Sequence, residues 1–311
     1  MMRFSPLFWP VFLKGKELCV LDETSLPRAP QYLNVTGYRQ SVRVIRRMQT
    51  RAIGQVLLVM YTFLLEIKKN GGKLSVQDLK KIAQALNSAR PTLPFKMLTG
   101  MVLGWAQAGE PVEQRISGFL EKLKSARIEQ AGEAAALFED GDSVLTHCNV
   151  SGLLPLIAEL CRNKGKSISF YATETRPYWQ GSRLTAWELK KAGVPVTVIT
   201  DGMAAQVMKE RRVNKIITGA DHLALNGDIA NKIGTLQLAI CAKYFGVPFY
   251  VLCPPPSQAA CGEDIKIEVR PGRELLSYRG LRLAPAGVNA YYPAFDVTPA
   301  GLITKHIHMR F

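Results

Sequence analysis

Short apolar runs that alternate with amphipathic segments distinguish the second half of the chain from the first. After residue 139 the sequence contains five runs rich in β-branched and aromatic residues, and segments of helical periodicity separate them. That alternation predicts β-strands joined by helices, and therefore a parallel sheet with helices on both faces. The five predicted strands are Val144–Thr146, Ser167–Ala172, Val196–Thr200, Lys215–Thr218 and Phe249–Leu252.

The first half of the chain is helical in pattern after a short β segment. Phe8–Leu21 predicts a β-hairpin about the turn Lys14-Gly15-Lys16, and only helical periodicity follows from Tyr38 to about Phe138. We therefore predict an α/β protein with an N-terminal β-hairpin plus helical domain (1–138) and a C-terminal Rossmann-like, doubly wound domain (139–311). The first predicted helices are Arg39–Arg51, Ala52–Lys69 and Val76–Leu86, and a rigid interruption follows at Arg90-Pro91-Thr92-Leu93-Pro94.

The most apolar segment, Ala52–Ile67, predicts a buried core helix and no membrane span. It is shorter than the roughly 20 residues that cross a bilayer, and it contains Gln55, Thr62 and Glu66. Two prolines interrupt the apolar N-terminus, which argues against a signal peptide. The six cysteines lack zinc-site spacing, so we expect reduced thiols in a cytoplasmic protein.

The formal net charge of +15 is the unusual bulk property of this chain. A basic protein attracts anions in general, including phosphate esters, nucleic acids and acidic lipids. Nucleic acid is not the expected partner, because there is no RGG tract, no block of five basic residues and no interleaving of aromatic and basic residues. The densest basic cluster predicts first a solvated helix face, with phosphate or nucleic-acid binding as the alternative; it consists of Arg39, Arg43, Arg46, Arg47 and Arg51.

Candidate chemical groups follow the predicted strands. Cys148 comes directly after Val144–Thr146, and Asp221 follows Lys215–Thr218. Ligands of open α/β sheets bind beyond the carboxyl ends of the strands, so a thiol and a carboxyl group at these places could act as acid/base groups. Asn231 and Lys232, predicted at the start of the helix 233–245, could hold a phosphate.

Each candidate has a plainer interpretation. Cys148 could be an inert core cysteine, Asp221 could cap the next helix, and Asn231-Lys232 could be a polar cap on a surface helix. Arg90 precedes a proline that would hold it rigidly, which is a weak signal alone. The sequence has neither GxGxxG nor GxxxxGK[ST], so it predicts no nucleotide cofactor, and the spacing of its cysteines and histidines predicts no metal.

Longer motifs resemble a known family. They are THCN (146–149), TETRPYWQGSRLTAWEL (173–189), GADHLALNGDIANKIGT (219–235) and PAFDVTP (293–299). These segments resemble the methylthioribose-1-phosphate isomerase family, which is homologous to ribose-1,5-bisphosphate isomerases and to the α, β and δ subunits of translation initiation factor 2B.

The resemblance implies a fold, a reaction and a set of site residues. It implies a homodimeric isomerase of methionine salvage, with no cofactor, that converts methylthioribose 1-phosphate into the ketose 1-phosphate. Cys148 and Asp221 match the catalytic pair. The residues that match substrate and phosphate contacts are Arg51, Arg90, Gln180, Asn231 and Lys232.

Two loops depart from the family pattern and leave alternatives open. The isomerases usually carry RGAPAIG before the first long helix, where this chain has Arg51-Ala52-Ile53-Gly54, and the segment after Cys148 is shorter than in that branch. The shorter spacing and Thr173 are closer to ribose-1,5-bisphosphate isomerases. A non-catalytic protein that resembles the initiation-factor subunits is the third possibility.

Overall fold

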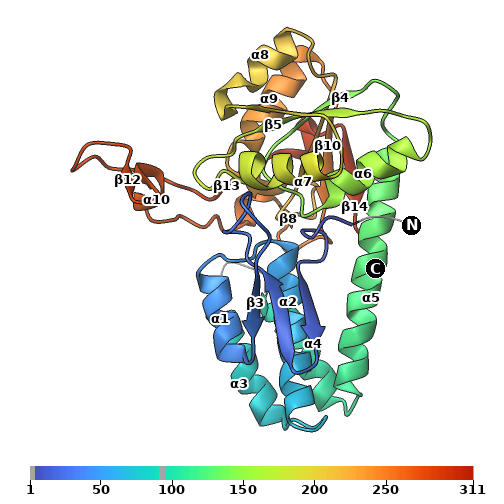
Figure 1. The fold of residues 1–311 in the computed structure, drawn as a ribbon, viewed down its shortest axis with the longest axis vertical. Helices are drawn as coiled ribbons and strands as arrows, with labels where there is room; N and C mark the ends of the chain where they lie inside the picture. The colour runs from blue at the N-terminus through green and yellow to red at the C-terminus, as the bar shows by residue number, and fades with distance from the viewer. Residues whose placement is uncertain (1–3, 91–94, 311) are drawn as a thin grey trace. The chain divides into compact units, whose positions relative to one another are not determined.

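The chain divides into two compact units, which are described separately. A computed structural model describes residues 4–90 and 95–310; the first unit ends at Ile128 and the second begins at Glu129. Helix α5 (Val112–Ala135) continues across this boundary (Figure 1). The predicted interruption at 91–94 lies outside the described residues.

The N-terminal unit combines a small antiparallel sheet with helices. The predicted hairpin is present, and a third strand, β3, joins it because its backbone pairs with β2 from Leu18↔Val35 to Leu21↔Tyr32. Helix α2 (Ile53–Lys69) is the core helix that its apolar sequence predicts, and most of its side chains are buried. The other elements are β1 (Val11–Lys14), β2 (Glu17–Leu21), β3 (Tyr32–Val35), α1 (Tyr38–Arg46), α3 (Val76–Asn87) and α4 (Phe95–Gln107).

The first helix ends earlier than its sequence pattern predicts. Helix α1 stops at Arg46 rather than near Arg51, and the chain between α1 and α2 includes Met48 and Ala52 with φ of 55° and 44°. Backbone in this left-handed region cannot continue a right-handed helix. Arg51 therefore lies in a loop at the start of α2 rather than on the α1 surface.

A six-stranded parallel sheet forms the centre of the C-terminal unit and confirms the predicted Rossmann-like fold. Its strand order is β14-β10-β7-β4-β5-β6, with parallel pairing between each pair of neighbours. Five strands were predicted; the sixth pairs along an edge. The strands are β4 (Ser143–Thr146), β5 (Ser169–Thr173), β6 (Val196–Ile199), β7 (Lys215–Gly219), β10 (Phe249–Cys253) and β14 (Lys305–His308).

The strand order reverses between β4 and β7. From β4 the chain builds outward through β5 to β6, and it then returns to place β7 on the other side of β4. Because parallel crossovers are right-handed, this reversal puts the two sets of helices on opposite faces. Helices α8 and α9 bury apolar side chains together against one face (Figure 1). The helices are α6 (Leu153–Arg162), α7 (Ala186–Lys191), α8 (Ala204–Lys209) and α9 (Thr235–Phe245).

A second, antiparallel sheet corrects one prediction about the site. Asn231 and Lys232 lie on strand β9 (Ile229–Lys232), not at the start of a helix, and helix α9 begins only at Thr235. Strand β9 is buried between β8 (His222–Leu223) and β13 (Phe295–Thr298), with Asp296 opposite Asn231. The polar end of β9 has no strand pattern in the sequence, because the strand that hydrogen-bonds to its backbone, β13, lies far along the chain.

The side-chain amide group of Gln130 joins the C-terminal part of helix α5 to the edge of the large sheet. The Nε2 atom of the buried Gln130 donates to the carbonyl oxygen of Cys253 on β10 at 2.9 Å and to that of Ile307 on β14 at 2.7 Å. Among residues 4–90 and 95–310, no helix is both long enough and apolar enough to cross a membrane.

We predict that Gln130→Leu lowers the free energy of unfolding by about 1–2 kcal/mol, because both buried carbonyl groups lose a donor. Chemical denaturation monitored by circular dichroism measures this change. Gln206→Leu is the control, since Gln206 is exposed and contacts only Glu210 through a side-chain hydrogen bond. Equal stability of the two variants would contradict a structural role for Gln130.

Candidate functional site

Cys148 and Asp221 follow two adjacent parallel strands at the point where the strand order reverses. Strand β4 ends two residues before Cys148, β7 ends two residues before Asp221, and the strands pair at Leu145↔Ile216. In doubly wound sheets this switch point opens a crevice beyond the strand ends, and ligands bind there. Both residues are half-buried rather than enclosed in the apolar core.

The backbone of Cys148 is held in a strained conformation. Its φ is 64°, a region that non-glycine residues enter at a cost of about 1 kcal/mol or more. Two threonines hold it there: the Cys148 amide donates to Thr175 Oγ1 at 2.9 Å, and Thr185 Oγ1 donates to the Cys148 carbonyl oxygen at 2.6 Å. Strain that surrounding hydrogen bonds maintain is common at active sites, where it fixes the direction of a reactive side chain.

Thr175 belongs to a second strained loop, which follows β5, and Thr185 lies in the helical turn Gly181–Thr185 that comes directly after this loop. Thr175 and Trp179 have φ of 62° and 60°, and Asp201 accepts from the amides of Thr175 and Arg176 at 2.8 Å each. Gln180 ends this loop, and its side chain is buried, with Oε1 accepting no hydrogen bond from the described residues. The loop therefore places Gln180 in the same strand-end region as Cys148.

His147 joins the Cys148 loop to the segment that carries Asn231 and Lys232. Its Nε2 lies 2.9 Å from the carbonyl oxygen of Ile233, and its Nδ1 lies 2.6 Å from Thr173 Oγ1. A carbonyl oxygen only accepts, so Nε2 carries the proton and Nδ1 accepts from the threonine hydroxyl. Burial lowers the pKa of His147 to about 4, against the opposing effect of Asp201, so the ring is neutral near pH 7.

Lys232 is a buried cation surrounded by aromatic rings. Its Nζ donates to the carbonyl oxygen of Ala294 at 3.0 Å and lies 5.7 Å, 6.0 Å and 5.1 Å from the ring centroids of Tyr178, Tyr292 and Phe295. Cation–π attraction is strongest where water is excluded, as it is here. The cage fixes the ammonium group in one position, which suits recognition of an anionic or hydroxyl-bearing ligand.

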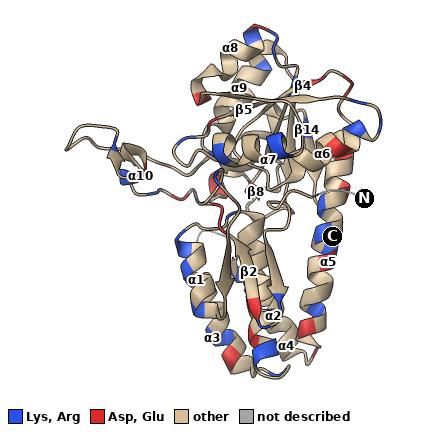
Figure 2. Cartoon of the chain, in the orientation of Figure 1, with Lys and Arg blue, Asp and Glu red and all other residues tan. Residues whose placement is uncertain are grey.

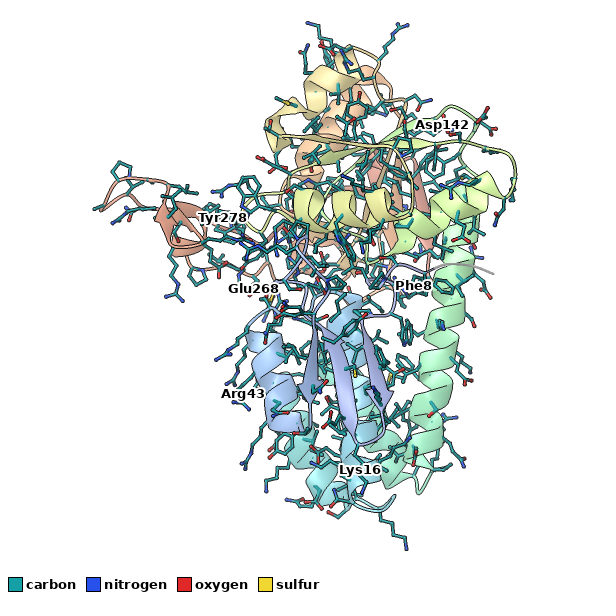
Figure 3. The ribbon with its side chains drawn as sticks, viewed as in Figure 1. Phe8, Lys16, Arg43, Asp142, Glu268 and Tyr278 are labelled. Carbon is teal, nitrogen blue, oxygen red and sulfur yellow. The ribbon has the colours of Figure 1, made fainter. Side chains whose placement is uncertain are left out.

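A projecting segment braces this cage. Arg270 donates to both carboxylate oxygens of Glu274, at 2.8 Å from Nε and 2.7 Å from Nη2, and Glu274 accepts from the Tyr178 hydroxyl. Burial raises the pKa of Tyr178, and the hydrogen bond to Glu274 raises it further, so the phenol stays protonated. Glu268, which accepts from Arg270 Nη1 at 2.8 Å, and Tyr278 mark this segment in Figure 3.

Asn231 and Asp296 organise the start of helix α9 beside Lys232. Asn231 Nδ2 donates to Thr235 Oγ1 at 2.9 Å, and Asp296 accepts from the amides of Gly234 and Leu236 at 2.6 Å and 3.1 Å. Burial raises the pKa of Asp296 to about 6, although these amides and Lys232 favour its charged form. Asp221 is joined to the same segment, because its amide donates to the carbonyl oxygen of Ala230 at 2.9 Å.

The two predicted phosphate arginines converge on one loop of the N-terminal unit. Arg51 Nε pairs with the buried Glu23 at 3.1 Å. Arg90 Nη1 donates to Gln55 Oε1 at 3.3 Å, and Gln55 Nε2 donates to the Thr50 carbonyl oxygen at 2.8 Å. Both guanidinium groups are thus fixed near the N-terminus of α2, where helix amides attract anions. Their part in the site stays a prediction.

Several residues that shape the site are not predicted from the sequence. Thr175 and Asp201 lie in polar segments at the ends of the predicted strands Ser167–Ala172 and Val196–Thr200, which is a usable signal. The partners of His147, Thr185 and Tyr292 come from distant segments. The six cysteines are free. Among the residues that the structure describes, no group of three or more His, Cys, Asp or Glu side chains could hold a metal ion.

Comparison with known proteins identifies the family. The model of the initiation factor 2 subunit family matches residues 46–308. The chain belongs to this family. A methylthioribose-1-phosphate isomerase from Desulforudis audaxviator is 37% identical over 98% of this chain and 93% of its own length. One from Thermosipho africanus is 35% identical, over 94% of this chain and 91% of its own length.

Solved structures with this fold include both functional branches of the family. The 5-methylthioribose 1-phosphate isomerase from Pyrococcus horikoshii OT3 has a TM-score of 0.86 and 28% identity, over 99% of this chain and 94% of that chain. The translation initiation factor eIF-2B subunit delta from A. fulgidus has a TM-score of 0.81 and 32% identity, over 96% of this chain and 94% of that chain. These two structures alone therefore do not separate an enzyme from a factor subunit, whereas the curated relatives at 35–37% identity are named as isomerases.

We predict that Gly181→Ala destabilises the strained loop by about 3 kcal/mol or more, because the added Cβ would lie 1.7 Å from the carbonyl oxygen of Thr173. Gly132→Ala is the matched control. Gly132 lies inside helix α5 with nothing within 4 Å of an added Cβ, so alanine there should gain about 0.5–1 kcal/mol. Thermal unfolding of both variants measures the difference, and a Gly181→Ala variant as stable as wild type would contradict the packing described here.

We predict that His147 makes the fold less stable in acid. Its folded pKa lies below its unfolded value, so the unfolded chain binds more protons between pH 6.5 and 4, and stability falls as pH falls through that range, by about 3 kcal/mol at most. Melting temperatures of wild type and His147→Gln across this pH range test the prediction. The variant should show a shallower decline; parallel curves would contradict it.

Proposed function

We propose that this protein is an aldose–ketose isomerase that converts S-methyl-5-thioribose 1-phosphate into S-methyl-5-thioribulose 1-phosphate. The observation that carries the proposal is that a thiol and a carboxyl group follow adjacent parallel strands, β4 and β7, where the strand order reverses. Relatives 35–37% identical over most of their length are named methylthioribose-1-phosphate isomerases. Such a sugar phosphate is an anion with several hydroxyl groups, which suits the buried Lys232 and the amides of Gln180 and Asn231.

The reaction requires ring opening and transfer of one hydrogen. The anomeric oxygen is esterified, so the ring oxygen must gain a proton as its bond to C1 breaks. The hydrogen on C2 then moves to C1, as a proton or a hydride, and the C2 hydroxyl loses its proton to become the ketone. No atom is gained or lost overall.

Cys148 and Asp221 fit two acid/base roles in this sequence. Asp221 would exchange protons with the ring oxygen and the hydroxyl oxygens, and Cys148 would act beside the carbon centre. The strained backbone of Cys148, held by Thr175 and Thr185, fixes the direction of the thiol before substrate binds. Such preorganisation lowers the barrier more than an equally placed but mobile group would.

Binding energy far from the reacting carbon atoms would hold the sugar in place. Lys232 and Gln180 would contact its oxygen atoms, and Arg51 and Arg90 are the proposed phosphate ligands. Interactions remote from the reacting bond can support catalysis when they are realised in the transition state. Glu23 keeps Arg51 in one orientation before substrate binds.

The exposed arginines of α1 favour a monophosphate substrate over a bisphosphate. A ribose-1,5-bisphosphate isomerase needs a second phosphate pocket, and in the sequence the α1 arginines are the basic cluster that could line such a pocket. Arg39, Arg43 and Arg46 are instead exposed side chains on the surface of α1, and the exposed Arg47 directly follows the helix.

We expect turnover of methylthioribose 1-phosphate to exceed that of ribose 1,5-bisphosphate in a side-by-side assay of ketose formation. Cys148→Ser and Asp221→Asn should each lower kcat by about 10²–10⁴-fold, because each removes a proton-transfer group. Cys241→Ser is the matched control, since Cys241 is a half-buried cysteine on α9, and it should leave kcat unchanged.

A non-catalytic role is the second candidate, supported by the 32% identity to the A. fulgidus initiation factor subunit. Stable, folded wild-type protein without turnover on any aldose 1-phosphate would defeat the isomerase proposal and favour that role.

A further inference from the structure

Positive charge is concentrated in the N-terminal unit. Residues 1–128 contain 20 basic and 8 acidic residues, a net charge of +12, whereas residues 129–311 contain 20 and 17, a net charge of +3. Between Thr24 and Gly109 there are 13 basic residues and only two acidic ones, Glu66 and Asp78. A charge asymmetry of this size between two parts of one chain is typical of proteins that bind polyanions.

Helix α1 presents a row of arginines to solvent. Arg39, Arg43 and Arg46 lie within one third of the helix circumference and are exposed, while the opposite side is buried through Val44 and Ile45. Arg43 projects outward in Figure 3, and Figure 2 shows basic residues along α1 and α3. At 1.5 Å per residue the row spans about 10 Å, the length of roughly three phosphates along one nucleic-acid strand.

The acidic residues nearby do not neutralise this row. Glu66 is half-buried and accepts the Tyr38 amide at 2.7 Å, which occupies it at the start of α1. Asp78 lies in the first turn of α3, where Ser75 contacts it at 2.6 Å. Arg46 Nη2 donates to Ser88 Oγ at 3.3 Å, a neutral partner. The α1 arginines thus keep their charge available to a ligand.

Two exposed aromatic rings lie on the sheet that leads into α1. Phe12 on β1 and Tyr32 on β3 are 39% and 44% exposed, and their ring centroids are 5.7 Å apart. Both lie on the outer face of the sheet, where the register places Phe12 opposite Cys19 and Tyr32 opposite Leu21. Only Thr36 and Gly37 separate β3 from α1. Exposed aromatic rings together with a basic surface are features with which many proteins bind single-stranded nucleic acid.

We propose that the N-terminal unit carries a separate binding site for single-stranded nucleic acid, in which the α1 arginines bind phosphates and the Phe12–Tyr32 pair stacks on a base. Arginine suits this role because its planar guanidinium group contacts phosphate oxygens in pairs and stacks on bases. Free bases are needed for stacking, so a single strand should bind more tightly than a duplex. This site does not depend on the proposed isomerase activity.

The test measures fluorescence anisotropy of a 5′-labelled, mixed-sequence 20-nucleotide RNA, and of the DNA with the same sequence, titrated with the full-length protein at several salt concentrations. We expect micromolar affinity at low salt that falls steeply as salt rises. Tighter binding of RNA than of DNA would assign the 2′-hydroxyl a contact, and equal binding would assign recognition to phosphate and base alone. Either result supports the site; absence of binding to both at 50 mM salt would overturn it.

A matched pair of variants separates this site from general attraction by charge. R39Q/R43Q/R46Q should weaken binding at least 10-fold and reduce the salt slope by about 2, since each phosphate contact on a single strand contributes about 0.7. K164Q/K190Q/K243Q removes the same charge from exposed positions of the C-terminal unit and should have little effect. An equal loss in both variants would reduce the proposal to non-specific attraction and overturn it.

The aromatic pair has its own test. F12S/Y32S should weaken binding of the single strand about 10-fold with an unchanged salt slope, because stacking releases no counterions. A 20-base-pair duplex should compete poorly against the labelled strand. Equal competition by the duplex would overturn the stacking part of the proposal. Isomerase turnover and melting temperature, measured on the same preparations, show whether each variant is folded.

Discussion

One hydrogen bond, from His147 Nε2 to the carbonyl oxygen of Ile233, joins the two parts of the candidate site. On one side lies the β4 loop with Cys148; on the other lies strand β9 with Asn231 and Lys232. The carbonyl group requires a protonated Nε2, and burial keeps the ring neutral, so Nδ1 is left to accept from Thr173. Gly234 is needed opposite the ring, because a Cβ there would lie 3.0 Å from it. The geometry of the site therefore depends on the protonation state of one side chain that need not touch substrate.

Buried charge is the second constraint. Lys232 and Asp296 lie in a region of low dielectric, where an isolated charge is costly and each attraction is strong. Aromatic rings and a carbonyl group contact the buried Lys232, and two backbone amides donate to the half-buried Asp296, so each group is kept in a fixed position. An ammonium group held in this way needs little reorganisation free energy when a ligand oxygen binds to it. This is the condition under which preorganised electrostatics contributes most to catalysis.

The sequence predicts the sheet well where local pattern decides structure, and poorly where distant pairing does. Val144–Thr146 and Lys215–Thr218 were predicted because apolar β-branched runs followed by small or polar residues are typical of parallel strands. Strand β14, with the sequence KHIH, has no such pattern and forms because β10 offers it a free edge. The sequence predicts a helix start at strand β9 because its partner β13 lies about 60 residues away and leaves no local signal of pairing.

In the candidate site, too, local sequence pattern predicts some features, and contacts with distant residues decide the others. Cys148 and Asp221 can be chosen from position alone, since any residue two places beyond a parallel strand reaches the ligand-binding edge. The strained backbone of Cys148 cannot be predicted from position, because it depends on hydrogen bonds with hydroxyl groups 27 and 37 residues away in the sequence.

The amount of charge can likewise be predicted from the sequence, but its arrangement on the surface depends on the fold. Composition gives the excess of basic residues, but only the fold separates Arg51, which pairs with Glu23, from the α1 arginines that face solvent. Phe12 on β1 and Tyr32 on β3 are distant in the sequence, and only the fold brings their rings together. An excess of twelve positive charges in the N-terminal unit is far more than one sugar phosphate requires, and this excess is the reason for proposing a ligand that carries many phosphates.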